Sequence, residues 1–164
     1  MPSKGKQLHK LLKEKALKRV VEQFDIDKIE NIHIEPRKES RVSRWREIMS
    51  VETHCFGLKS QRVFFPDIVF VYPLEKPVKV KNMKNIDYGY DFQNEKEVTK
   101  KVVVIECEVR ANSQLLSGGL RSIGYRMLKE EHGQLLYLIL AKFKDVKMAN
   151  TDLFDEIWEF EKND

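Results

Sequence analysis

The sequence predicts a single α/β domain, and three observations support this prediction. Apolar residues recur at three- and four-residue intervals over 3–24, which is typical of an amphipathic helix. Two strongly apolar runs, 62–72 and 101–110, have the β-branched and aromatic content of buried strands. A helical segment separates the second run from another apolar strand at 134–143, and such a crossover favours parallel pairing of the two strands.

Composition limits the class of protein. The chain has 164 residues, 34% of them charged and 41% hydrophobic, so we expect one globular domain spanning 1–164. The formal charge of +4 does not by itself require a nucleic-acid partner. No apolar run approaches the roughly 20 residues of a membrane span, and two cysteines, Cys55 and Cys107, are too few for a disulfide framework. We therefore expect a cytoplasmic protein that does not enter a membrane.

The first predicted helix, 3–24, carries many lysines outside its apolar stripe. Lys10 and Lys13 belong to this basic surface, which is either a solvated helix face or a face that contacts phosphates. The segment 31–36 is a short strand candidate that ends at a proline. A second basic segment follows, and an aromatic among basic residues suits either a nucleic-acid contact or a surface helix docked by its tryptophan. The residues of this segment are Arg37, Lys38, Arg41, Arg44, Trp45 and Arg46.

The segment 74–100 is long for a loop in a compact domain. Its first part alternates well enough to be a strand, so we expect a protruding arm or hairpin insertion there. After the central strand, Asn112 or Ser113 is expected to cap a helix that runs to about residue 131 and ends at Gly133. The expected apolar face of this helix is Leu116, Leu120, Ile123 and Met127, and the expected opposite stripe is Gln114, Ser117, Arg121 and Tyr125. That stripe would meet DNA, a second subunit or solvent. A final helix is expected over about 152–160.

Acidic residues interrupt both apolar runs. Alternation along 101–110 places Glu106, Glu108 and Arg110 on one face of the strand. Neighbouring carboxylates on a buried strand are costly because desolvation and repulsion both oppose their ionisation. Asp67 poses the same problem in the middle of 62–72. If the two strands are neighbours, the three acids converge on a hard cation such as Mg²⁺ or Mn²⁺. The alternative is a surface strand with a charged outer face.

These residues also carry a resemblance to a known family. Pro66-Asp67, followed by Ile105-Glu106-Cys107-Glu108 on an apolar strand, resembles the PD-(D/E)xK nuclease superfamily, which includes type II restriction endonucleases and archaeal Holliday junction resolvases. The resemblance implies a restriction-endonuclease-like core over about 5–143, consisting of a helix, a three-strand meander, a helix and a strand. The C-terminal helix at 152–160 would follow this core.

The resemblance implies a metal-dependent endonuclease that hydrolyses DNA phosphodiester bonds, including those of branched or junction DNA, as a homodimer. Asp67, Glu106 and Glu108 would be catalytic. Asp67, Glu106 and the backbone carbonyl of Cys107 would hold Mg²⁺ or Mn²⁺, together with an acid of the first helix, for which Glu14 and Glu22 are both candidates. The expected DNA-binding residues are Lys10, Lys13, Arg37, Lys38, Arg41, Arg44, Arg110, Arg121 and Tyr125.

The chain departs from the family pattern at one position. Glu108 stands two residues after Glu106, where the family usually has lysine. A second register would take Glu108 and Arg110 as the glutamate and the basic residue, but arginine is a poor proton acceptor and the first register is preferred. The alternative function is therefore a catalytically inactive DNA-binding or interaction protein with the same fold.

Overall fold

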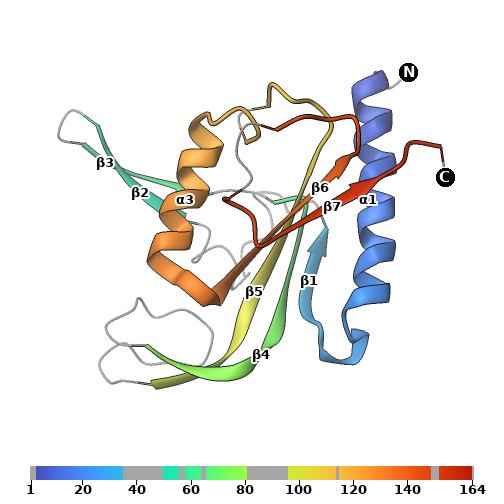
Figure 1. Ribbon diagram of the computed structural model, residues 1–164. Helices are drawn as coiled ribbons and strands as arrows, with labels where there is room; N and C mark the ends of the chain where they lie inside the picture. The colour runs from blue at the N-terminus through green and yellow to red at the C-terminus, as the bar shows by residue number, and fades with distance from the viewer. Residues whose placement is uncertain are drawn as a thin grey trace.

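A five-stranded mixed sheet forms the centre of the protein (Figure 1). The computed structural model describes residues 3–34, 50–55, 58–63, 66–80, 96–113, 115–148 and 152–163. The strand order is β1 (Glu30–Ile34), β4 (Ile68–Val80), β5 (Lys96–Glu108), β6 (Leu136–Phe143) and β7 (Glu156–Phe160). β1, β4 and β5 pair antiparallel, whereas β5, β6 and β7 pair parallel. The predicted α/β class and the predicted parallel pairing of β5 with β6 are thus confirmed.

Helices α1 (Lys4–Gln23) and α3 (Leu120–His132) lie on the two sides of this sheet (Figure 1). The predicted first helix is confirmed, and the side chain of Ser3 caps it by accepting a hydrogen bond from the Lys6 N–H at 3.2 Å. α1 buries a stripe of small and branched apolar residues, Leu12, Ala16 and Val20. Short 3₁₀ helices follow each α-helix, η1 (Ile26–Lys28) and η2 (Gly133–Leu135). Within the described ranges, no helix combines the length and the apolar character needed to cross a membrane.

β5 is the central strand and is buried on both faces. Its run from Val102 to Ile105 is fully buried, as the β-branched sequence predicts for a strand covered from two sides. Alternation places Glu106 on the face covered by α3 and Cys107 on the face covered by α1. An arginine of α3 accordingly bonds Glu106, and Lys13 of α1 acts electrostatically on Cys107. The strand therefore carries polar groups toward both helices at its C-terminal end.

Two further pairings concern the expected strand 62–72 and the expected arm. β2 (Ser50–Cys55) and β3 (Leu58–Val63) form a separate two-stranded sheet. The expected single strand through Asp67 is wrong, because β3 ends before Asp67 and β4 begins directly after it. Pro66 has no N–H to donate to a ladder, and aspartate is a poor strand former, so regular strand structure is interrupted at Pro66 and Asp67. β4 and β5 pair antiparallel as far as Val80 and Lys96, and the residues between these two lie outside the described part.

The C-terminal helix predicted over 152–160 is wrong, because this segment forms β7 instead. A helix of nine residues is too short to be stable on its own. Parallel pairing with β6 satisfies the backbone groups of the segment and buries Trp158. Asp155 fixes the start of the strand, because its carboxylate accepts the Leu138 N–H at 2.7 Å and its own N–H donates to the Leu138 carbonyl at 2.8 Å.

The predicted start of the second helix is also wrong. Ser113 caps only one turn, in which its hydroxyl accepts the Leu116 N–H at 3.1 Å. Gly118 then takes φ 81°, a conformation that other residues avoid, and α3 begins two residues later. This break changes the rotational phase of the helix. The expected apolar face is consequently wrong beyond Leu116, because Leu120, Ile123 and Met127 are exposed whereas Ser122, Gly124, Tyr125, Leu128 and His132 are buried.

Candidate functional site

Asp67 and Glu106 meet where β4 begins beside the C-terminal end of β5. The antiparallel register pairs Ile68 with Ile105, and its continuation sets Asp67 opposite Glu106. The Asp67 N–H donates to Glu106 Oε1 at 3.3 Å. The Asp67 carboxylate in turn accepts the Cys107 N–H on Oδ2 at 2.7 Å. The side chain of Asp67 thus continues the contact between the two strands after the regular ladder has ended.

α3 supplies a cation to this pair of acids. The Arg121 Nε donates a hydrogen bond to Glu106 Oε2 at 2.9 Å, and Nη2 lies 2.9 Å from the same oxygen in an ion pair. Glu106 is 2% exposed and Arg121 is 27% exposed, so this is a largely buried ion pair. The expected DNA contact of Tyr125 is wrong, because its side chain is fully buried, with its ring 5.6 Å from the Arg121 guanidinium carbon. Arg121 therefore pairs with a buried acid, and Tyr125 packs beside Arg121 in the interior of the protein.

α1 contributes His9, which the sequence analysis missed. His9 Nε2 lies 3.0 Å from Asp67 Oδ1, and the two side chains are 30% and 20% exposed. The spacing of His9 contained a signal, because it precedes the buried residues Leu12, Ala16 and Val20 by 3, 7 and 11 positions and so belongs to the same stripe. The expectation that Glu14 or Glu22 joins the acids is not met, because both side chains are exposed. The first helix thus contributes a histidine to the site and not the expected acid.

The electrostatics of the site reflect three carboxylates at the end of one sheet. The pKa of Glu106 is raised from 4.5 to about 8, chiefly by burial and also by the charges of Asp67 and Glu108, against the lowering effect of Arg121. Burial also raises the pKa of Glu108, again with a contribution from Asp67, while a hydrogen bond from Ser113 opposes the shift. Glu108 thus belongs to the same electrostatic cluster, which we call the carboxylate cluster: Asp67, Glu106 and Glu108.

The donor atoms of this cluster suit a hard cation such as Mg²⁺ or Mn²⁺, because they are carboxylate oxygens with an excess of negative charge. Among the residues that the structure describes, no three His, Cys, Asp or Glu side chains are arranged as a metal-binding group. Without an acid from the first helix, the expected ligand set is reduced to two such side chains, Asp67 and Glu106, and the Cys107 carbonyl. Arg121 and His9 each hold one oxygen of these acids, so a cation would have to share or displace their contacts.

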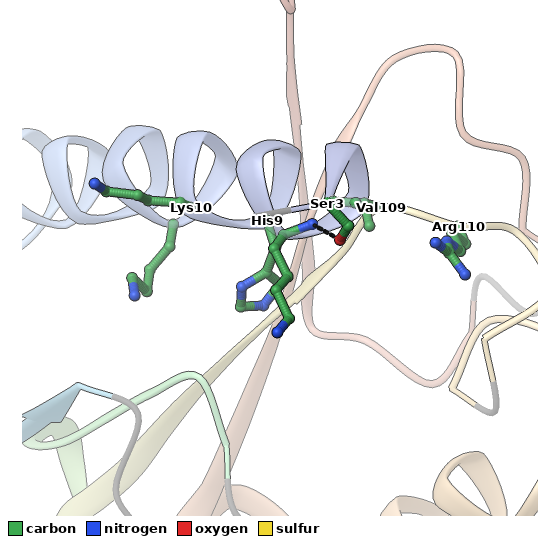
Figure 2. Close-up of a pocket in the computed structure, with 8 residues that line it drawn as sticks. Ser3, His9, Lys10, Val109 and Arg110 are labelled. Carbon is green, nitrogen blue, oxygen red and sulfur yellow. Dashed lines mark hydrogen bonds between the residues drawn. The ribbon is translucent and has the colours of Figure 1, made fainter. Parts of the chain in front are cut away.

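A cavity of about 540 Å³ lies beside the carboxylate cluster and is shown in Figure 2. Three of the expected DNA-binding residues, Lys10, Lys13 and Arg110, line this cavity. His9 lines it as well and links it to Asp67. Four other expected DNA-binding residues lie outside the described part of the chain, namely Arg37, Lys38, Arg41 and Arg44. The described geometry therefore sets a cationic cavity next to a cluster of acids.

Comparison of the chain with models of protein families, with curated proteins and with solved structures finds no match.

Proposed function

We propose that the chain is a metal-dependent endonuclease of the PD-(D/E)xK type with a restriction-endonuclease-like core, and that it hydrolyses DNA phosphodiester bonds, including those of branched or junction DNA. One observation carries the proposal: the carboxylate cluster at the ends of β4 and β5 adjoins a cavity lined by Lys6, Lys10, Lys13 and Arg110. Phosphodiester hydrolysis needs both parts. Acids hold a divalent cation at the reacting phosphate, and lysines and arginines hold the neighbouring phosphates.

Each group of the site has a role in this reaction. Asp67, Glu106 and the Cys107 carbonyl would hold Mg²⁺ or Mn²⁺, which supplies Lewis acidity at the scissile phosphate and lowers the pKa of bound water. Glu108 would take up the proton of the attacking water, because a raised pKa makes its carboxylate a stronger base than an exposed glutamate. Arg121 would balance the negative charge of Glu106, and His9 would orient Asp67. Arg121 thereby supplies a cation in a site that lacks the usual lysine.

Cleavage assays test this proposal. The parent protein should cut supercoiled, linear or branched DNA in Mg²⁺ or Mn²⁺, and the three forms together report the preferred substrate. Asp67→Asn and Glu106→Gln should each lower the rate by about 100-fold or more, the usual effect of removing a group that acts on the transition state. Glu22→Gln is the matched control, since it removes an exposed acid of α1, and it should cut like the parent. Equal rates in all four proteins would overturn the proposal.

A second candidate function is supported by the contacts of the acids. Arg121 and His9 already bind Glu106 and Asp67, as would be expected if the chain were a DNA-binding protein that no longer cleaves. Such a protein would bind DNA with the same salt dependence in chelator and in Mn²⁺, and would cut none of the three DNA forms. The same assays therefore separate the two candidates.

A homodimer belongs to the proposal, because symmetric cleavage of two strands requires two sites related by a two-fold axis. Sedimentation of the protein with and without branched DNA measures this directly. A protein that stays monomeric in both conditions and cuts only one strand of a duplex would be a nicking enzyme.

A further inference from the structure

The cavity beside α1 has an unusual concentration of positive charge. Lys6, Lys10 and Lys13 follow one another at intervals of four and three residues, so they share a face of the helix. Arg110 adds a fourth cation from the segment after β5, and Figure 2 shows it together with His9 and Lys10 among the residues around the cavity. Four cationic side chains around one cavity create a positive potential there. The cavity therefore favours an anionic ligand.

Gly5 allows Arg110 to approach α1 closely. A Cβ atom at position 5 would lie 3.0 Å from Arg110 Nη2, which is closer than side chains normally come. The absence of a side chain at Gly5 thus lets the guanidinium lie directly against the first turn of the helix. A guanidinium held in this way can donate two parallel hydrogen bonds to phosphate oxygens, while the lysines act as point charges around them.

The cavity also has a defined position relative to the carboxylate cluster. His9 lines it and bonds Asp67 at 3.0 Å, and Arg110 follows Glu108 by two residues. A ligand in the cavity would therefore lie next to the acids rather than on a remote surface.

We propose that this cavity binds a phosphate monoester, the doubly charged terminal phosphate of a nucleic-acid strand or of a nucleotide. A monoester carries about −1.5 to −2 charges at pH 7, whereas an internal phosphodiester carries one, so four cations in a single cavity fit the monoester better. The inference that the phosphate belongs to a DNA strand rests on the proposed function. The inference that the cavity binds a terminal phosphate does not. The site would then place a strand end, and not only an internal stretch, beside the carboxylate cluster.

Binding measured in chelator tests the inference without requiring cleavage. Oligonucleotides of one sequence, with either a phosphate or a hydroxyl at the 5′ or the 3′ end, are compared by fluorescence anisotropy. We expect at least one phosphorylated end to bind about tenfold more tightly than its hydroxyl counterpart, which corresponds to one extra charge-assisted contact. Equal affinities for phosphate and hydroxyl ends would overturn the inference.

Matched variants show whether the cavity is responsible. Lys10→Gln and Arg110→Gln should abolish the preference for the phosphorylated end. Lys18→Gln removes an exposed lysine of the same helix that does not line the cavity, and it should keep the preference. Gly5→Ala should weaken the preference without lowering the melting temperature, because alanine is a better helix former than glycine. An equal loss in Lys18→Gln would indicate general electrostatic attraction and would refute the cavity as the site.

Competition separates the two sources of the phosphate and separates this inference from the nuclease proposal. A nucleoside monophosphate that competes as well as the phosphorylated oligonucleotide would identify the ligand as a nucleotide. Weaker competition by the mononucleotide would identify it as a strand end. A preference for phosphate in a protein that cuts no DNA in Mn²⁺ would leave the cavity site standing and would remove the nuclease.

Discussion

Arg121 directs two nitrogen atoms at a single oxygen of Glu106, each at 2.9 Å, in a part of the molecule where Glu106 is almost fully buried. This pair joins α3 to the central strand and balances part of the charge of the carboxylate cluster. Replacement of one partner leaves the other without a counter-charge in a desolvated place, which is far more costly than loss of a surface pair.

The stability of the protein should fall with rising pH through the titration of Glu106. The folded state keeps the proton up to about pH 8, whereas the unfolded state loses it near pH 4.5. The stabilising effect of this group is therefore complete below pH 4.5 and is lost as the pH rises to 8, at up to about 1.4 kcal/mol per pH unit. Urea unfolding of Glu106→Gln should show a shallower pH dependence than unfolding of the parent, because the variant lacks the group that titrates. Identical slopes would contradict the assignment.

Loss of the Arg121 guanidinium should destabilise the protein in a pH-dependent way. At pH 9, where Glu106 is ionised in the parent, Arg121→Met should lower the free energy of unfolding by about 3 kcal/mol, because the carboxylate remains buried without its partner. The loss should be smaller at pH 5, where Glu106 is protonated. Arg126→Met is the control on the same helix, since its pair with Asp152 is exposed, and it should change much less at either pH.

Glu108→Lys should lower the pKa of Glu106. The charge of Glu108 now raises that pKa, and a lysine would replace repulsion by attraction. The pH at which stability declines should shift downward accordingly, and under the nuclease proposal some cleavage should persist because lysine is the residue usual in the family. Glu97→Lys makes the same charge change at an exposed position of β5 and should leave the titration of Glu106 unaltered.

The two glycines before α3 should differ in their tolerance of alanine. Gly118 has φ 81°, so Gly118→Ala should cost about 1–2 kcal/mol in unfolding free energy. Gly119 has φ −77°, which alanine adopts freely, so Gly119→Ala should have a much smaller effect. If the helix instead ran without a break from residue 112, both substitutions would stabilise it. Thermal melts of the two variants distinguish these outcomes.

Periodicity and apolar content were sufficient to predict α1, the central strand β5 and the parallel pairing of β5 with β6. They failed where two structures competed for one short segment. The residues of β7 have an apolar pattern that fits a helix as well as a strand, and only the free edge of β6 decides between them. α3 was displaced because the conformation of Gly118 is a backbone property, and apolar periodicity contains no information about it.

The acids of the candidate site were predicted from the sequence, but their partners were not. The convergence of Asp67 with Glu106 followed from two apolar strands that each carry an acid. The partners of these acids come from both helices. The phase of α1 could be predicted from its apolar stripe, whereas the phase of α3 depends on the break at Gly118. Arg121 was assigned to an outer stripe because the predicted helix began too early.

The hydrogen bond from the Cys107 N–H to Asp67 gives this aspartate a task in folding that is independent of any chemistry. Its carboxylate stands where a main-chain carbonyl would otherwise extend the ladder between β4 and β5. Replacement of Asp67 should therefore weaken the pairing of β4 with β5 whether or not the chain catalyses a reaction.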